Sequence, residues 1–336
     1  MNSKRKIKII STGKYLPKRI VTSEEVDRMM KIPEGTIANR VGIKERRYAM
    51  GPEESAAKMA AYAVMDALEK SNLKLTDLDA IICTSGTGEQ EVPYDAALVL
   101  KNLSQERLGL ATFDVCTTCT SFITGLDVVS YMVDAGRYKR VAIVSSDVAS
   151  VGIDYTKMES GALFGDGAAA VIIERTPEGE GSGIIHAVQE TFPEGSETCR
   201  LVGGGSKVKT SDYLNPELRE QFLFQMDGKN VFKLASQVVG PVVERLFKEA
   251  NLKVSDMAIS VPHQASPSGM ELIRKKLEIP TEKWVNIIEN HGNMVAASIP
   301  MALCYAIEEG RVQRGEKIFL LGTSAGFSVG GLVLEY

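Results

Sequence analysis

The sequence lacks the features on which several classes of protein depend. Histidine occurs only as His186, His263 and His291, none of which has a second potential ligand beside it at metal-site spacing, so we expect no zinc site. No uncharged apolar run reaches the roughly 18 residues of a membrane-spanning helix. The basic start MNSKRKIKIISTGKYLP contains no apolar segment long enough for a signal peptide. We therefore expect a cytoplasmic protein without a membrane span.

An excess of positive charge and a regular spacing of cysteines are also missing. The 336 residues include 39 Lys and Arg against 43 Asp and Glu, and the net charge of −4 provides no basic field for nucleic acid or an anionic membrane. Cysteine occurs five times, at positions 83, 116, 119, 199 and 304. An odd number of cysteines, without the regular spacing of a disulfide framework, is typical of a protein in a reducing compartment. We therefore expect each thiol to serve either packing or chemistry.

Apolar residues are abundant and follow the periods of both strands and helices. They make up 44% of the chain, enough for a large core. Runs rich in Val and Ile alternate with amphipathic segments, a pattern that predicts an α/β fold with buried strands. The predicted strands are 79–86, 140–147, 168–174, 256–264, 316–326 and 330–336, and the main predicted helices are 54–72, 229–250 and 296–309.

An internal repeat divides the chain into two similar parts. LEKSNLKLTDLDA at 68–80 returns as FKEANLKVSDMAI at 247–259. The repeat predicts two α/β halves, residues 1–175 and 229–336, joined by an irregular connection over 176–228. A duplicated fold of this kind places its site where the halves meet, at helix N-termini and strand ends.

The stretch FDVCTTCTSFITGL places Cys116 and Cys119 directly ahead of a predicted helix. The apolar positions recur at helical spacing, at Phe122, Leu126, Val129 and Val133. The helix therefore begins close to Cys119, where backbone N–H groups and the helix dipole favour a thiolate and lower the thiol pKa. Inert packing of Cys119, or a redox dithiol with Cys116, are the alternative interpretations.

Two polar residues are well placed to assist a nucleophile. His263, in SVPHQAS, follows a predicted strand that Pro262 ends, so it lies on a strand-end loop. Asn293, in NHGNMVAASIP, precedes a helix whose first turn contains Pro300. We expect Cys119, His263 and Asn293 at equivalent cleft positions of the two halves, where together they predict nucleophilic catalysis.

In these motifs the sequence resembles the thiolase-like condensing enzymes, and within them the ketoacyl-ACP synthase III family. Beside the cysteine motif, FGDGAAAVII, DGKNVFKLA, HQAS, GNMVAASIP and GTSAGFSVGG follow in the family's order over nearly the whole chain. The resemblance implies a five-layered αβαβα fold, a homodimer, and a catalytic triad of Cys119, His263 and Asn293. Cys116 is absent from the family pattern, and we interpret it as packing.

The resemblance also implies a decarboxylative Claisen condensation. Cys119 attacks an acyl thioester, and backbone N–H groups at Cys119 and near Gly326 hold the oxyanion. A malonyl thioester then loses CO₂, while His263 and Asn293 stabilise the enolate as neutral donors. The glycine turn lacks the second cysteine of a degradative thiolase, which favours the irreversible synthase reaction. The implied partners are acyl carrier protein or coenzyme A thioesters, and no metal or redox cofactor is required.

Several positions depart from the fatty-acid-initiating members of the family. Thr36 stands where those members have a Trp that stacks on the CoA adenine, and Met158 stands where they have the opposing Arg, while Arg40 is kept. Stacking and cation–π contacts are worth roughly 1–3 kcal/mol each, so their loss weakens recognition of CoA. We therefore expect a specialised enzyme, primed by an acyl-ACP or an unusual acyl group.

Basic side chains offer a docking surface for the acidic acyl carrier protein. Lys233 and Lys275 fall where the family uses Lys for docking, and Ser268 falls where it often has Arg. The pathway stays open between fatty-acid initiation, polyketide starter formation and long-chain head-to-head condensation. Two further alternatives are an acyltransferase that passes the acyl group from Cys119 to a hydroxyl or amine, and a non-enzymatic dithiol or thioester-binding module.

Overall fold

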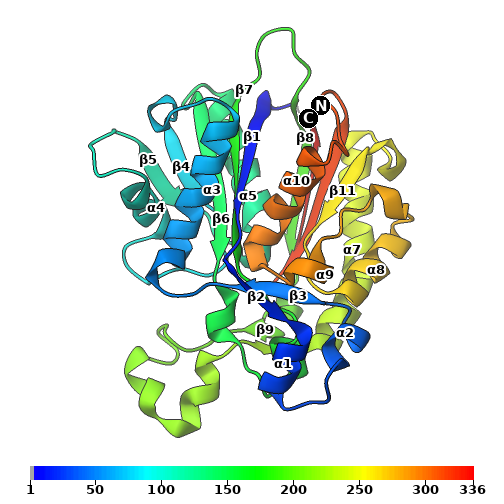
Figure 1. Cartoon of the computed structure of the whole chain (residues 1–336). Coiled ribbons are helices and arrows are strands. Elements are labelled where there is room, and N and C mark those ends of the chain that lie inside the picture. Colours follow the sequence, from blue (N-terminus) through cyan, green and yellow to red (C-terminus); the bar gives the residue numbers. More distant parts are fainter. Residues whose placement is uncertain (1–3) are drawn as a thin grey trace.

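Two mixed β-sheets, one from each half of the chain, form the framework of the protein (Figure 1). The computed structural model describes residues 4–336. The first sheet, in the order β1-β7-β6-β4-β5, consists of β1 (Ile7–Tyr15), β4 (Ala80–Cys83), β5 (Ala111–Asp114), β6 (Arg140–Asp147) and β7 (Gly167–Arg175). The second sheet, in the order β11-β12-β13-β8, consists of β8 (Gly183–Thr191), β11 (Ile259–Pro262), β12 (Lys317–Ser324) and β13 (Ser328–Glu335).

Two short ribbons and ten α-helices complete the described chain. The ribbons pair β2 (Arg19–Thr22) with β3 (Glu45–Tyr48), and β9 (Cys199–Arg200) with β10 (Gln225–Met226). The helices are α1 (Ser23–Met30), α2 (Thr36–Arg40), α3 (Ala56–Lys70), α4 (Asp95–Leu103), α5 (Ser121–Asp134), α6 (Met158–Gly161), α7 (Gly228–Ala250), α8 (Pro267–Lys276), α9 (Ile288–His291) and α10 (Ser298–Glu308). The longest predicted helices correspond to α3, α7 and α10.

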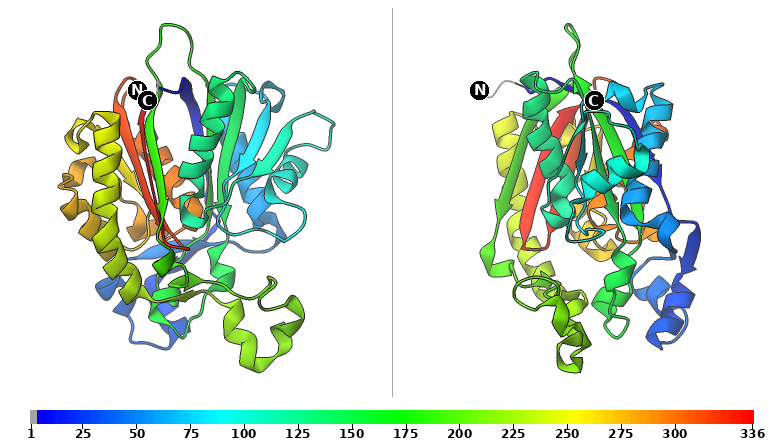
Figure 2. Two further views of the ribbon diagram at one scale, coloured as in Figure 1. Left: turned by 180° about the vertical axis from the view of Figure 1, so that it is seen from behind. Right: turned by 90° about the vertical axis from the view of Figure 1, so that its left-hand side faces the viewer.

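The helices and sheets stack in five layers. One hydrophobic cluster joins the inner faces of both sheets to α5 and α10, which therefore lie between the sheets. A second cluster packs α3 and α4 on the outer face of the first sheet, and a third packs α7 on the outer face of the second sheet. Figure 2 shows this arrangement from two further sides. The αβαβα order confirms the predicted fold class.

Burial on both faces explains why the central strands consist of continuous apolar runs. In β6, Val141 and Ile143 belong to the inner cluster, while Ala142 and Val144 belong to the outer one. Strand β12 shows the same alternation, because Ile318 and Leu320 face inward while Phe319 and Leu321 pack against α7. Since successive side chains of a strand point to opposite faces, a strand covered by helices on both sides has no polar face.

The segment 176–228 contains a strand that the sequence analysis missed. Strand β8 lies within this segment and pairs with β13 along its whole length, from Thr191 opposite Ser328 to Gly183 opposite Glu335. The second half therefore begins at β8 and not at residue 229. Strand β8 escaped prediction because it is an edge strand whose residues are mostly half-buried, so its apolar alternation is weak.

Between β8 and α7, residues 192–227 contain only short elements and are called the cap segment below. It lies with α1 and α2 at the end of the molecule opposite the two termini (Figures 1 and 2). Over residues 4–336, we find no helix whose length and hydropathy would let it cross a membrane.

Candidate active site

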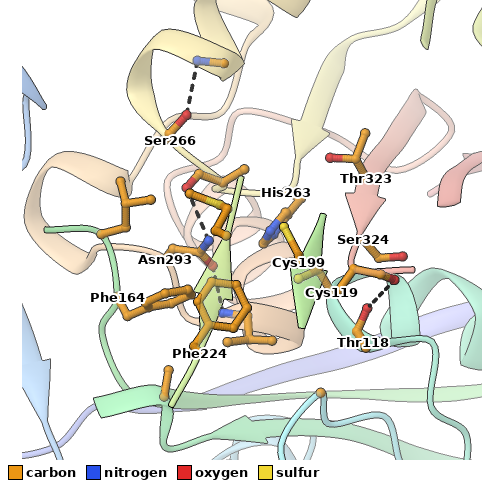
Figure 3. A pocket seen from close by; sticks show the side chains of 18 of the residues that line it. Thr118, Cys119, Phe164, Cys199, Phe224, His263, Ser266, Asn293, Thr323 and Ser324 are labelled. Carbon is orange, nitrogen blue, oxygen red and sulfur yellow. Dashed lines mark hydrogen bonds between the residues drawn. The ribbon is translucent and has the colours of Figure 1, made fainter. Parts of the chain in front are cut away.

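A cavity of about 1260 Å³ is lined by residues from both halves and from the cap segment. Cys119, His263 and Asn293 all line this cavity, and Figure 3 shows the three side chains around a common space. The structure therefore brings together the three residues that the sequence predicted as a triad.

Cys119 lies in a 3₁₀ turn, Thr118–Thr120, immediately before α5. The backbone enters this turn at Thr118 with a φ of 51°, a left-handed conformation that non-glycine residues rarely adopt. The hydroxyl of Ser121, the first residue of α5, accepts a hydrogen bond from the Thr117 N–H at 2.9 Å. This bond helps to hold the turn of Cys119 at the start of the helix, where the sequence predicted Cys119 to lie.

The expected lowering of the Cys119 pKa is wrong. Burial raises the pKa of the Cys119 thiol to about 12, and the Asp147 carboxylate and the Cys199 thiol raise it further. Backbone hydrogen bonds at Ala325 and Cys119 act in the opposite direction but do not outweigh burial. The helix start lies inside the protein, where removing water disfavours a thiolate more than N–H donors favour it. The resting site therefore holds a protonated thiol.

The backbone group that meets this thiol belongs to Ala325, one residue before the predicted Gly326. Both residues line the cavity in the hairpin turn that joins β12 to β13. Gly326 has a φ of 82° and Phe327 a φ of 45°, so the turn folds back tightly. The Thr118 hydroxyl donates to the Ala325 carbonyl at 3.3 Å. This bond links the hairpin turn to the 3₁₀ turn that contains Cys119. The oxyanion role predicted at Gly326 stays a prediction, and Ala325 is a second candidate in the same turn because its backbone meets the thiol.

His263 follows β11 directly, on the strand-end loop that the sequence predicted. Its backbone N–H donates to the Leu321 carbonyl of β12 at 2.7 Å. His263 is 5% exposed, and the Nδ1 atom of its imidazole has no hydrogen-bond partner among residues 4–336. Burial lowers the pKa of His263 to about 4, because the charged ring would lose its water. The imidazole is therefore neutral, with one N–H to donate and one lone pair to accept.

Asn293 is oriented by bonds on both sides of its amide. Its Oδ1 accepts from the Val295 N–H at 2.9 Å, and its Nδ2 donates to the carbonyl of Ala265 at 3.2 Å. Ala265 belongs to the loop of His263, so one short segment supports both polar groups. Since an amide nitrogen carries two hydrogens, one N–H of Asn293 is left for a ligand in the cavity.

The loop of Asn293 is also fixed to the first half of the chain. Its backbone N–H donates to Leu163 O at 2.8 Å, and its carbonyl accepts from the Gly165 N–H at 3.0 Å. A Cβ atom at Gly165 would lie 2.2 Å from the carbonyl oxygen of His291. Only glycine permits this approach, which accounts for the FGDG stretch.

Cys119 and Asn293 do not occupy equivalent positions in the two halves, contrary to expectation. Each central helix is preceded by a 3₁₀ turn that opens on a residue with positive φ, Thr118 before α5 and Val295 before α10. The structural counterpart of Cys119 is therefore Ala296, while Asn293 corresponds to Cys116. The site is asymmetric because its groups come from different positions of the repeat.

The comparisons with known proteins agree with this geometry. The family described as 3-Oxoacyl-[acyl-carrier-protein (ACP)] synthase III matches residues 113–192, and its C-terminal counterpart matches residues 247–336. The beta-ketoacyl-[acyl-carrier-protein] synthase III of Koribacter versatilis is 30% identical over 100% of this chain and 99% of its own length. The chain belongs to the synthase III family of condensing enzymes.

Solved structures of synthase III proteins resemble the whole chain. The crystal structure of 3-oxoacyl-[acyl-carrier-protein] synthase III from Aquifex aeolicus superposes with a TM-score of 0.87 at 31% identity, covering 98% of this chain and 100% of the other. The priming beta-ketosynthase from the R1128 polyketide biosynthetic pathway gives 0.88 at 26% identity, covering 100% of this chain and 97% of the other. Both similarities extend over the two halves and the cap segment.

Asp147 is a buried carboxylate of this synthase III chain that the sequence analysis missed. Its Oδ1 accepts from the Gly86 N–H at 2.9 Å, the Thr87 N–H at 2.8 Å and the Thr87 hydroxyl at 2.9 Å. Its Oδ2 accepts from the Ala297 N–H, at the start of α10, at 3.0 Å. Burial raises the pKa of Asp147 to about 7, although these bonds favour the carboxylate. Asp147 therefore connects the first half to the helix that follows Asn293.

Cys116 does not pack into the core, and that interpretation is wrong. Its side chain is exposed, and it lies outside the cavity lining. Cys199 of the cap segment, which received no role from the sequence, lines the cavity beside Cys119 (Figure 3). The β9–β10 ribbon places the Cys199 side chain at the cavity, and no local pattern in the sequence predicts this position.

The residues expected to contact the carrier lie around the cavity and on the neighbouring surface. Arg40 and Met158 line the cavity. Lys233 on α7 and Lys275 on α8 are exposed, and Lys275 Nζ lies 3.3 Å from Glu271. The two helices that carry these lysines are neighbours in the fold.

Proposed function

We propose that the chain joins a Cys119-bound acyl group to a malonyl thioester by decarboxylative Claisen condensation, in a ping-pong cycle. The observation that carries the proposal is the convergence of a thiol, a neutral imidazole and an amide on one cavity, in a chain of the synthase III family. These are the groups that acyl transfer and enolate stabilisation require. The apolar walls of the cavity suit a hydrocarbon acyl chain.

The first half-reaction transfers the acyl group to Cys119. The sulfur attacks the thioester carbonyl, and backbone N–H groups at Cys119 and in the turn of Ala325 and Gly326 hold the oxyanion. When the intermediate collapses, the carrier leaves as a thiol with the proton that Cys119 has lost. Because the free thiol is buried and protonated, Cys119 loses this proton as its sulfur attacks the carbonyl, and the proton reaches the carrier when the intermediate collapses. The neutral imidazole of His263 is in the state that can relay the proton.

The second half-reaction forms the carbon–carbon bond. The bond between the malonyl carbon and its carboxylate breaks, CO₂ leaves, and the electron pair forms an enolate. Its oxygen receives hydrogen bonds from the N–H of neutral His263 and from Nδ2 of Asn293. The enolate carbon attacks the acyl carbonyl, and collapse of the second oxyanion returns the electron pair to the sulfur of Cys119, which takes up one proton from solvent and becomes a thiol again. Cys119 and the substrates supply every electron pair, and no step passes electrons to or from an external partner, so the proposed cycle requires no metal or redox cofactor.

Mass spectrometry and carbon balance test this proposal together. Incubation with acyl-CoA and acyl-ACP panels adds one acyl group to Cys119, and later addition of malonyl-ACP releases CO₂ and a 3-oxoacyl product. If the acyl group instead passes to a hydroxyl or amine without release of CO₂, the chain is an acyltransferase on the same scaffold. If no acyl group reaches Cys119, both the condensation proposal and the acyltransferase alternative are wrong.

We also propose that acyl-ACP is a better donor than acyl-CoA. Thr36 and Met158 provide neither the aromatic nor the cationic group that clamps adenine, and Lys233 and Lys275 provide positive charge for an acidic carrier. Exposed charges of this kind mainly set the association rate and its salt dependence. We expect kcat/KM for one acyl group to be higher on ACP than on CoA, with a difference that shrinks at high salt. Equal use of both donors at all salt concentrations would overturn this assignment.

We further propose a homodimer that forms through the open edge of β5. This strand ends the first sheet, so one row of its backbone groups faces outward. Val92 is 82% exposed and Tyr94 47% exposed next to this edge, and the Tyr94 hydroxyl lies 2.9 Å from the Thr112 hydroxyl of β5. Light scattering should give twice the chain mass for the wild type and the monomer mass for Val92→Glu combined with Tyr94→Glu. A wild-type monomer at micromolar concentration would contradict the proposal.

A further inference from the structure

The cavity contains a second thiol that the condensation does not use. Cys199 lines the cavity together with Cys119, and Figure 3 shows their side chains next to each other. Cys199 is among the groups that raise the pKa of Cys119, after burial and Asp147. The other three cysteines do not share this place, since Cys83 and Cys304 are buried in separate clusters and Cys116 is exposed.

The backbone that carries Cys199 belongs to a short ribbon. Strand β9 has two residues, and its partner β10 places Met226 opposite Cys199. The Asp227 N–H donates to the Thr198 carbonyl at 2.7 Å, and the Thr198 N–H donates to the Gly195 carbonyl at 3.1 Å. The Nε of Arg200 also donates to Oε1 of Gln225 at 3.0 Å. A disulfide requires the two sulfur atoms about 2.05 Å apart. The β9–β10 ribbon belongs to neither of the two large sheets, so a shift of the ribbon toward Cys119 would break no strand pairing within them.

We propose that Cys119 and Cys199 form a reversible disulfide when a peroxide oxidises the free enzyme. The peroxide transfers one oxygen to the sulfur of one cysteine, which becomes a sulfenic acid, and one water is released. The second thiol attacks the sulfenic sulfur, the S–S bond forms, and the hydroxyl leaves as a second water. One peroxide and two thiols thus give one disulfide and two waters.

The neighbouring thiol changes the fate of an oxidised nucleophile. A lone sulfenic acid reacts with more peroxide to a sulfinic acid, which ordinary thiols cannot reduce. Cys199 intercepts the sulfenic acid, and the resulting disulfide returns to two thiols with a dithiol reductant. Because burial raises the pKa of both thiols, little thiolate is present and oxidation is slow at neutral pH. The pair therefore protects Cys119 under strong oxidation and does not sense trace peroxide.

The test exposes the purified chain, without acyl donor, to hydrogen peroxide at pH 8.5, followed by blocking of free thiols and digestion without reductant. We expect a Cys119–Cys199 cross-linked peptide, a mass loss of about 2 Da, and recovery of both thiols with dithiothreitol. In Cys199→Ser, Cys119 should instead gain about 32 Da as a sulfinic acid that dithiothreitol does not reverse. Cys116→Ser is the matched control and should behave like the wild type.

Two results would overturn the proposal. One is the absence of the cross-linked peptide from oxidised wild type, and the other is equal sulfinic acid at Cys119 in wild type and Cys199→Ser. Cys199→Ala, compared by circular dichroism and thermal melting, separates a change in chemistry from a loss of fold. Because the readout is the mass of each cysteine peptide, the result stands whether or not the chain catalyses condensation.

Discussion

Replacing Asp147 with Asn tests whether this buried carboxylate positions the active site. Asn keeps the size of the side chain but exchanges one oxygen for an NH₂ group. In the wild type, Oδ1 accepts three hydrogen bonds and Oδ2 accepts one from Ala297. Whichever way the amide turns, its NH₂ group faces at least one N–H donor, so a buried donor is left unpaired.

The structure sets the size of the expected effects. An unpaired buried donor costs about 1–3 kcal/mol in free energy of unfolding. Part of this cost is offset, because burying the Asp147 carboxylate is itself unfavourable, as its pKa of about 7 indicates. We therefore expect a melting temperature several degrees lower than that of the wild type. Condensation should fall by about 10²-fold, because a shift at the start of α10 moves Asn293 away from the enolate oxygen.

The reactivity of Cys119 distinguishes a positioning role from general damage. The negative charge of Asp147 raises the pKa of Cys119, so Asp147→Asn should shift the pH profile of iodoacetamide alkylation to lower pH. Asp95→Asn is the matched control, since this buried carboxylate accepts the Glu89 N–H at 3.0 Å and lies outside the cavity lining. The control should lower the melting temperature without shifting the profile. An unchanged profile and unchanged condensation in Asp147→Asn would refute the reasoning.

The remaining predictions concern the triad. Cys119→Ala should abolish acyl-enzyme formation in intact-mass measurements, whereas Cys116→Ala should retain it; acyl label on Cys116 would reverse the assignment. His263→Ala or Asn293→Ala should slow malonyl decarboxylation by about 10²–10³-fold with a smaller effect on acylation, and equal losses in both half-reactions would indicate a structural role. His263 has a pKa lowered from 6.5 to about 4, so its contribution to stability is present above pH 6.5 and is lost as the pH falls through 4. Urea unfolding of wild type and His263→Gln should therefore show a stability difference that falls by roughly 3 kcal/mol over this range. A constant difference would show that His263 titrates normally. Asp147, whose pKa is raised from 3.8 to about 7, changes stability in the opposite sense over much of this range, so the variant must be compared with wild type at each pH.

Local patterns in the sequence determined most of the framework. The apolar runs of β6 and β12, the spacing of α5 and the repeat between the halves indicated a duplicated α/β fold. They did so because strand and helix periods are properties of neighbouring residues. The motifs around Cys119, His263 and Asn293 likewise showed which side chains follow a strand or precede a helix, and hence which ones reach the cleft.

Only the tertiary structure decided the environment of these groups. Strand β8 is a strand because β13 offers a partner, and Cys199 reaches the cavity because the chain returns through β10. The pKa of Cys119 rises because residues distant in sequence exclude water from the start of α5, an effect larger than the helix dipole that the local sequence indicated. Asp147 acquires its role from donors on two separate segments, Gly86–Thr87 and Ala297. Burial and long-range pairing depend on how the whole chain packs, and no local pattern of residues contains that information.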